Sequence, residues 1–156
     1  MKRKIVKYKD FDWYVLNENE DTVTLFMKDE LNVDVVKDIC EDETMYDVNR
    51  IAHFKVGKEY KWKTSYVRKI LNDKFLENYL DKNDLVKIDE DYVRLLKLEE
   101  IDWNNNIFKL SEPYWLMTKM GPSRVAYVYG YGDVSSISAG YLVSVRPVIN
   151  LKRRKK

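Results

Sequence analysis

The feature that most constrains the fold is one long helical pattern among strand patterns. In the stretch YKWKTSYVRKILNDKFLENYL, residues 60–80, apolar side chains recur at three- and four-residue spacing, which is the period of one buried helix face. They are Val67, Ile70, Leu71, Phe75, Leu76, Tyr79 and Leu80. Thr64 and Ser65 precede the pattern and offer the oxygen acceptors that a helix start needs. The sequence therefore predicts one main amphipathic helix over about residues 65–80.

Strand patterns flank this helix on both sides. The runs before it are residues 4–8, 11–16 and 22–27, and the polar stretch NENED predicts a hairpin between the last two. The runs after it are residues 92–98, 114–120, 124–132 and 142–151, with loops at GPS and at DVSSISAG, residues 133–140. Residues 92–98 fit a strand or a helical turn, and that choice stays open. Strands, one helix and strands again predict a compact α+β domain of antiparallel strands.

Length and composition indicate a single domain that folds without crosslinks. A chain of 156 residues can bury its own core, and we assign residues 1–151 to the domain and 152–156 to a basic tail. Cys40 is the single cysteine, and no apolar stretch is long enough for a signal peptide or a membrane span. We therefore expect a soluble protein in the cytoplasm of a bacterial cell or an infected host cell.

The net charge of +2 conceals an asymmetry along the chain. Residues 2–9 carry five Lys or Arg, and the tail carries five more, namely Lys152, Arg153, Arg154, Lys155 and Lys156. The body between these ends retains 18 basic against 26 acidic residues. A basic tail is either a solvated end or a contact for a phosphate backbone, and both interpretations stay open. The acidic body favours a basic protein partner over general nucleic-acid binding.

Groups that commonly do catalysis are scarce in this chain. His53 is the only histidine, and no glycine-rich phosphate loop or nucleophile elbow is present. One cysteine and one histidine exclude a metal cluster of the Cys/His type. A Cys40–His53 dyad is the remaining alternative, although such lone residues are more often structural. The sequence therefore predicts a protein that is not an enzyme, with no cofactor and no metal.

Three motifs in the chain resemble a known family. WKTSYVRKILNDKF resembles the W-x-x-S-x-x-R-x-W-L-N-x-x-F signature of an uncharacterised domain family of bacterial and phage-encoded proteins, YWLMT resembles its W-W-L-R-S segment, and VSVRPVINL resembles its G-V-R-P-x-x-x-L strand. The matches keep the family's order from about Trp13 to Leu151. Three positions depart from the pattern, namely Ile70, Met117 and Ser144.

The resemblance implies a fold and a set of structural residues. That family is similar to the C-type-lectin-like fold in the version of the formylglycine-generating, or sulfatase-modifying, enzymes, with both termini in antiparallel strands. It implies no activity, and one cysteine does not fit that oxidase chemistry. The motif residues are Trp62, Ser65, Arg68, Asn72, Trp115, Arg146 and Pro147. We expect Arg68 to tie the helix to neighbouring strands, Trp62 to pack at the helix entrance and Asn72 to serve a turn end or kink.

A row of tyrosines is the best candidate for a binding surface. In RVAYVYGYGDV, Tyr127, Tyr129 and Tyr131 share one side of a predicted strand, while Ala126 and Val128 share the other. Tyrosine supplies large contact area with few rotamers to freeze. Three neighbours are predicted to join or flank this row: Tyr141, Arg124 and Asp133. The alternative is that the rings cover a second, smaller core.

These observations favour a non-catalytic binding module that recognises a protein partner. A phage or mobile-element accessory protein is the expected context, and inhibition of a host nucleoprotein defence complex, as by an anti-CRISPR protein, is its specific form. The acidic body would then compete with nucleic acid for a basic channel. Two alternatives remain: nucleic-acid binding by the basic ends with tyrosine stacking, and binding of a carbohydrate or small ligand on a lectin-like fold.

Overall fold

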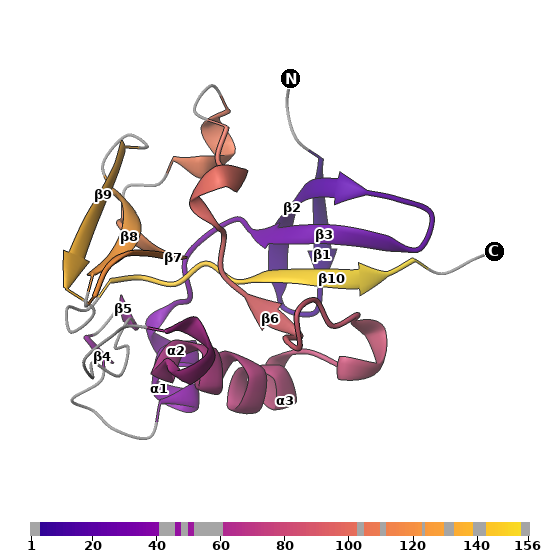
Figure 1. The fold of residues 1–156 in the computed structure, drawn as a ribbon. Coiled ribbons are helices and arrows are strands. Elements are labelled where there is room, and N and C mark those ends of the chain that lie inside the picture. The colour runs from indigo at the N-terminus through magenta and orange to yellow at the C-terminus, as the bar shows by residue number, and fades with distance from the viewer. Residues whose placement is uncertain are drawn as a thin grey trace.

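The computed structural model describes residues 4–40, 46–47, 50–51, 61–102, 105–109, 112–122, 124–129, 133–138 and 143–153. Within these ranges the chain forms a five-stranded and a three-stranded antiparallel sheet, and one main helix packs beneath the larger sheet (Figure 1). A further short pair joins β4 (Tyr46–Asp47) and β5 (Arg50–Ile51). The predicted α+β class is confirmed.

The larger sheet contains the strands from both ends of the chain. Its order is β1-β2-β3-β10-β6, with bounds Ile5–Tyr8, Phe11–Glu18, Thr22–Met27, Val148–Lys152 and Val93–Arg94. The predicted hairpin is confirmed between β2 and β3, and its turn is organised by Asn19. The side-chain oxygen of Asn19 accepts hydrogen bonds from the N–H groups of Asp21 and Thr22 at 2.9 and 2.8 Å, which is the turn chemistry of an Asx residue.

The predicted main helix is confirmed and runs without a break from Tyr66 to Tyr79. It consists of α2 (Tyr66–Ile70), a π-helical turn (Leu71–Phe75) and α3 (Leu76–Tyr79). Ser65 is its N-cap, and its hydroxyl accepts a hydrogen bond from the N–H of Arg68. Thr64 belongs to the preceding 3-10 turn, and its hydroxyl donates to the carbonyl of Lys61. The cap that the helix uses is therefore Ser65.

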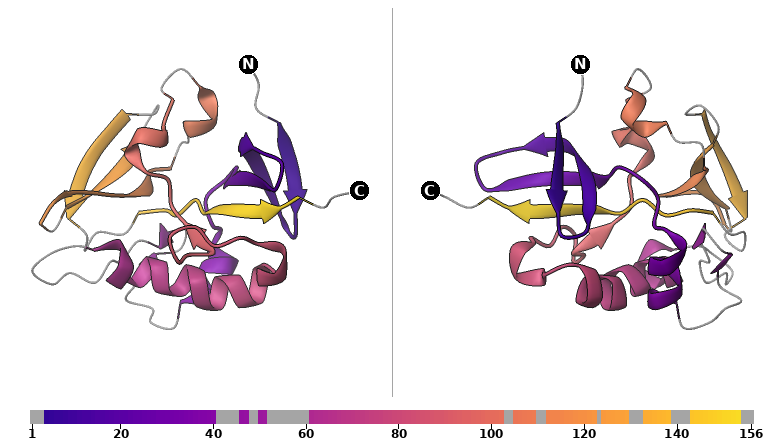
Figure 2. Two further views of the ribbon diagram at one scale, coloured as in Figure 1. Left: turned by 45° about the vertical axis from the view of Figure 1, so that its right-hand side comes forward. Right: turned by 180° about the vertical axis from the view of Figure 1, so that it is seen from behind.

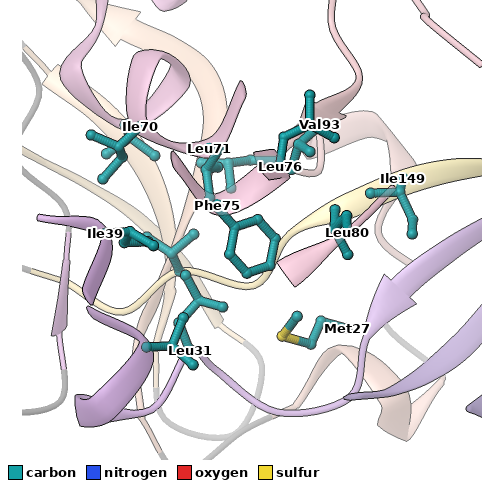
Figure 3. Close-up of a cluster of buried hydrophobic side chains, with 14 of the residues drawn as sticks. Met27, Leu31, Ile39, Ile70, Leu71, Phe75, Leu76, Leu80, Val93 and Ile149 are labelled. Carbon is teal, nitrogen blue, oxygen red and sulfur yellow. The ribbon is translucent and has the colours of Figure 1, made fainter. Parts of the chain in front are cut away.

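The buried face of this helix closes the main core against the larger sheet. Leu71 and Phe75 are fully buried, and Phe75 points from the helix toward Met27 and Leu31 (Figure 3). The short helix α1 (Val33–Ile39), in a region without a sequence assignment, adds Val36 and Ile39 to the same cluster. Each such side chain contributes about 1.5–3 kcal/mol by leaving water.

Asn72 joins the π-helical turn to strand β6. Its amide nitrogen donates to the carbonyls of Arg68 and Val93 at 3.0 and 2.8 Å, and its amide oxygen accepts from the N–H groups of Tyr92 and Val93, both at 2.9 Å. Two donors and two accepting lone pairs are the full capacity of the amide. An asparagine at the kink therefore serves both the helix and the strand, whereas the sequence indicated a role in the helix alone.

A buried carboxylate fixes the entrance of the helix. Asp91 accepts a hydrogen bond from the indole N–H of Trp62 at 2.8 Å and from Nε of Arg68 at 2.6 Å. Trp62 packs against the main core, and Arg68 also donates to the carbonyl of Lys63. Trp62 thus lies at the helix entrance, and Arg68 ties the helix to the turn that contains Asp91 rather than to a strand.

A tight turn delivers Asp91 to this position. Ile88 and Asp91 exchange two backbone hydrogen bonds, and the two residues between them, Asp89 and Glu90, have positive φ of 51° and 75°. Two such residues in succession are typical of a type I′ turn, which strongly favours glycine at its second position. The turn is thus conformationally strained at non-glycine residues.

The second sheet contains a strand that the sequence did not predict. The sheet consists of β7 (Tyr114–Gly121), β8 (Arg124–Tyr129) and β9 (Asp133–Ser138), in that order. The prediction of a loop at DVSSISAG was wrong for residues 133–138. All six residues of β9 pair with β8, and Ile137 packs against the main core. The serines indicated a loop because their signal is local, whereas the pairing partner lies earlier in the chain.

The strands at residues 92–98 and 142–151 are shorter than the sequence predicts. One strand is expected over residues 142–151, but β10 begins at Val148, directly after Pro147, which lacks an N–H group. The carbonyl of Pro147 still accepts from the N–H of Met27. In residues 92–98, only Val93–Arg94 form a strand, and a 3-10 turn follows at Leu98–Glu100.

Arg146 connects the two sheets from within the protein. It is 1% exposed, and its guanidinium donates to the carbonyls of Met27, Lys28 and Ile107 at 3.1, 2.8 and 3.0 Å. The same group lies 3.9 Å from the ring centre of Phe26 and 4.7 Å from that of Tyr114. Backbone dipoles and two aromatic faces thus surround this cation.

No helix among the described residues is long and apolar enough to cross a membrane.

Replacing Arg146 by methionine leaves the buried carbonyls of Met27 and Ile107 and the partly buried carbonyl of Lys28 without this donor, so we expect a loss of about 3 kcal/mol in unfolding free energy. Arg146→Lys should recover little of this loss, because one ammonium group cannot reproduce the planar fork. Urea titration measures both values, with the exposed Lys109→Met as control. A methionine variant as stable as the wild type would contradict this role.

The turn at Asp89 and Glu90 gives a second prediction. Glu90→Gly should be more stable than Glu90→Ala by about 1 kcal/mol, because only glycine adopts positive φ without steric cost. Both changes remove the same carboxylate, so the comparison isolates the backbone effect. Thermal unfolding followed by circular dichroism is the measurement, and equal melting temperatures would refute the strain.

Candidate interaction surface

Strand β8 carries the tyrosine row, and its two faces contribute to different cores. Ala126 and Val128 are buried in a smaller cluster with Phe26, Phe108 and Tyr114. Val125 is fully buried in the main core on the opposite face. This alternation matches the two-residue period of a strand. Ala126 and Val128 therefore face a core, but the tyrosine side of the strand is also buried at one end.

Burial decreases along the tyrosine face of β8. Tyr127 is half-buried and meets the fully buried Trp115 edge to face, with ring centres 6.3 Å apart. Tyr129 is 40% exposed, and its ring centre lies 5.6 Å from that of Tyr127. The rings form a continuous series from the core to the surface. Tyr127 therefore supports Tyr129, and Tyr129 is the residue available for contact.

The neighbouring strand completes this surface. In the β8–β9 register, Tyr127 lies opposite Ser135 and Tyr129 lies opposite Asp133, so all four side chains share one face. We call Tyr127, Tyr129, Asp133 and Ser135 the tyrosine patch. Asp133 and Ser135 are exposed.

The other residues predicted for this surface lie elsewhere or outside the described residues. Arg124 is on the Ala126 face of β8, and its guanidinium donates to the hydroxyl and carbonyl oxygens of Ser136 at 3.0 and 2.6 Å. It therefore ties β8 to β9 and does not border Tyr129. Tyr131 and Tyr141 fall outside the described residues.

The first residues of the basic tail are bound to the domain. Lys152 is the last residue of β10, and its ammonium group donates to the carbonyl of Asn83 at 3.1 Å. Arg153 donates through its side chain to the carbonyl of Asn19 at 2.8 Å and lies 3.6 Å from the carboxylate of Glu18. Arg154, Lys155 and Lys156 lie outside the described residues. Two of the five tail cations thus serve internal contacts.

The candidate nucleophile has an unfavourable environment for catalysis. Burial raises the pKa of Cys40 to about 12, against smaller opposing effects of Tyr66 and Lys74. A thiol with that pKa is not ionised at neutral pH and is a poor nucleophile. His53, the other member of the hypothetical dyad, lies outside the described residues. Among the residues that are described, no three His, Cys, Asp or Glu side chains gather at metal-binding distance.

An ion pair that the sequence did not predict positions the segment leading to the second sheet. Arg94 and Glu100 form two hydrogen bonds of 2.6 and 2.9 Å, and Glu100 also accepts from the N–H of Lys97 at 2.8 Å. The 3-10 turn that they close bonds to β7 through Leu98, whose N–H donates to the hydroxyl of Thr118. A glutamate that accepts from the backbone three residues earlier is a capping signal, and the sequence contains it.

This ion pair makes stability dependent on pH. Burial alone raises the pKa of Glu100, but hydrogen bonds from Arg94 and the N–H of Lys97 outweigh it, and the pKa is lowered. The stabilisation is present above the pKa of the unfolded chain, about 4.5, and is lost as the pH falls through the folded pKa.

We therefore expect Glu100→Gln to cost about 1–2 kcal/mol at pH 7, because Glu100 is partly exposed and solvent weakens the pair. The difference from the wild type should shrink below pH 4.5, where Glu100 of the unfolded chain takes up a proton, and should be lost as the pH falls through the lower folded pKa. Urea unfolding at several pH values measures it, with the exposed Glu99→Gln as matched control. A constant difference between pH 7 and pH 3 would exclude the carboxylate charge as its cause.

Comparison with known proteins identified no relative of this chain. It matches no protein-family model, no curated protein and no solved structure. The candidate function therefore depends on the geometry of the described residues.

Proposed function

We propose that the protein is a non-catalytic binding module that recognises a protein partner through the tyrosine patch. The observation that carries this proposal is the contact between the rings of Tyr127 and Tyr129, which leaves the ring of Tyr129 exposed on the sheet. Because the ring of Tyr129 already packs against Tyr127, it loses little rotamer freedom on binding, and more of its contact area contributes to affinity. Aromatic side chains with such support are typical anchors of protein interfaces.

The charge of the surface favours a basic partner. The patch contains the exposed carboxylate of Asp133, and the chain between its basic ends has an excess of acidic residues. A partner with a basic surface would be attracted at long range and matched at the contact. Nucleic-acid-binding proteins have such surfaces, and a host nucleoprotein defence complex inhibited by a phage or mobile-element protein is the specific form of this proposal.

The proposed scaffold is the C-type-lectin-like fold in its sulfatase-modifying-factor version. Support comes from the two terminal strands in one antiparallel sheet and from the structural roles of the motif residues Ser65, Asn72 and Arg146. On such a scaffold, function resides in particular surfaces rather than in the fold. The assignment thus agrees with a binding role and does not itself supply one.

The hydrogen bonds between the first tail residues and the domain favour a protein partner over nucleic acid. Lys152 and Arg153 already donate to backbone carbonyls of the domain, and releasing them would cost those hydrogen bonds. Binding through an aromatic anchor should depend weakly on salt, whereas neutralising phosphates would make affinity fall steeply with salt.

The test is capture of partners from an extract of the native host by the immobilised full chain. We expect Tyr129→Ala to weaken binding of the specific partner at least tenfold, because it removes the exposed anchor and leaves the core intact. Ile88→Ala is the matched control, since Ile88 is also 40% exposed but lies outside the patch. Titration at two salt concentrations is the accompanying measurement.

Two results would refute the proposed function. One is a partner that binds Tyr129→Ala as tightly as the wild type. The other is binding that disappears when residues 154–156 are deleted and that falls steeply with salt, which would support direct binding of nucleic acid.

A further inference from the structure

Strand β9 lies at the outer edge of the second sheet. The order of this sheet is β7-β8-β9, so β9 is one of its two edge strands, and the sheet lies on the side of the molecule away from β1 and β2 (Figure 2). Within the part of the chain that the structure describes, no strand pairs with the side of β9 that faces away from β8. An edge of this kind presents backbone N–H and C=O groups that another extended chain can use.

One edge of the larger sheet differs from β9 in composition. Strand β1 is the edge of the larger sheet, and Lys4, Lys7 and Lys9 are exposed within or beside it. Lysine at an edge discourages pairing with a further strand. Strand β9 reads DVSSIS and contains neither lysine nor proline. Its small hydroxyl side chains leave room for a neighbouring backbone.

The edge is also rigid. All six residues of β9 are in register with β8, and Ile137 and Val134 pack against the main and the smaller core, respectively. Arg124 fastens the strand through the hydroxyl and carbonyl of Ser136. A strand that is already paired and packed loses less conformational entropy when a ligand binds, which favours affinity.

The side chains at one end of β9 indicate which residue the added strand carries. Asp133 is exposed, and among the described residues its carboxylate has no hydrogen bond or ion pair. The ring of Tyr129 lies directly across the β8–β9 pair from it. A carboxylate beside an aromatic ring suits arginine, because the planar guanidinium forms hydrogen bonds to the carboxylate and stacks on the ring.

We propose that an extended segment of the partner adds to the outer edge of β9 as a fourth strand, with an arginine opposite Asp133. This rests on the proposed function and specifies its partner: a peptide segment that contributes backbone hydrogen bonds along β9 and one basic side chain to the tyrosine patch. Adjacent strands lie about 4.8 Å apart, so Tyr129 is two strand spacings from the added chain. An arginine that extends over Asp133 approaches the ring.

In this mode of recognition, backbone hydrogen bonds supply the affinity and side chains supply the specificity. Alternate residues of an edge strand direct their N–H and C=O groups outward, so the backbone of β9 supplies affinity for any extended chain. The pair Asp133 and Tyr129 supplies the selection for arginine. Lysine at the same position should bind less well, because it forms only a point charge and no planar stack.

The experiment uses a displayed library of random linear twelve-residue peptides, selected against the full chain. We expect enriched peptides with one arginine and β-branched residues at alternate positions. Their synthetic forms should slow hydrogen exchange of backbone amides within residues 133–137, because outward N–H groups become bonded. Asp133→Asn should weaken them about fivefold, while Asp12→Asn, a change at another exposed strand aspartate, should leave affinity unchanged.

Proline substitution tests the backbone contribution separately. Of Ser135→Pro and Ser136→Pro, one removes an N–H directed to β8 and the other an N–H directed outward, because neighbouring strand residues alternate. Thermal unfolding identifies the variant that keeps its stability, and that variant should lose peptide binding at least tenfold. If both unfold, the hydrogen-exchange pattern and Asp133→Asn decide the question.

Several results would overturn the proposal. They are failure to enrich any peptide, peptides that bind without protecting β9 amides, and peptides that bind the folded proline variant equally well. Protection of β9 in a dimer without peptide, seen by sedimentation, would assign the edge to a second copy instead. A partner lost on Tyr129→Ala but retained by the proline variant would overturn strand addition alone, whereas a partner unaffected by either would overturn the proposed function too.

Discussion

The buried guanidinium of Arg146 is the contact on which the arrangement of the two sheets depends. A cation without water costs several kcal/mol unless its donors are matched. Here the acceptors are carbonyls of Met27 and Lys28, at and just after the end of β3, and of Ile107, in the turn before β7. The ring of Tyr114, at the start of β7, stacks on the same group. These segments bring their acceptors to Nε and Nη2 of the cation only when they meet, so the charge specifies where the second sheet attaches.

The elements predicted correctly are those whose signal is local. Periodicity alone indicated the helix at Tyr66–Tyr79, and alternation with a polar turn indicated the β2–β3 hairpin. Strand β9 was missed because Ser135, Ser136 and Ser138 have weak strand preference, and its pairing with β8 is a tertiary effect. The opposite error occurs before β10. The apolar residues in 143–147 favour a strand, but Pro147 lacks an N–H group, and the strand begins only at Val148.

The candidate surface was predictable in part, for the same reason. The orientation of Tyr127 and Tyr129 followed from the two-residue period of a strand. The same two-residue period places Arg124 on the face of Ala126, opposite to that of Tyr129, so the separation of Arg124 from the patch could have been deduced. The half-burial of Tyr127 could not, because it depends on Trp115 in β7. The place of Asp133 opposite Tyr129 likewise required the register of β9.

Stability explains the composition of β9 only in part, through the hydroxyl of Ser136, which accepts a hydrogen bond from Arg124. Ser135 is exposed, and serines at its neighbouring positions bury little apolar surface, so β-branched residues there would strengthen the strand. By contrast, β1 contains Lys7 and is flanked by Lys4 and Lys9, and lysine at an edge discourages pairing with a further strand. A strand with small side chains, a fastened backbone and a carboxylate beside a supported tyrosine ring has the properties that pairing with another chain requires. The features that make β9 hard to predict as a strand are therefore the ones that suit it to recognition.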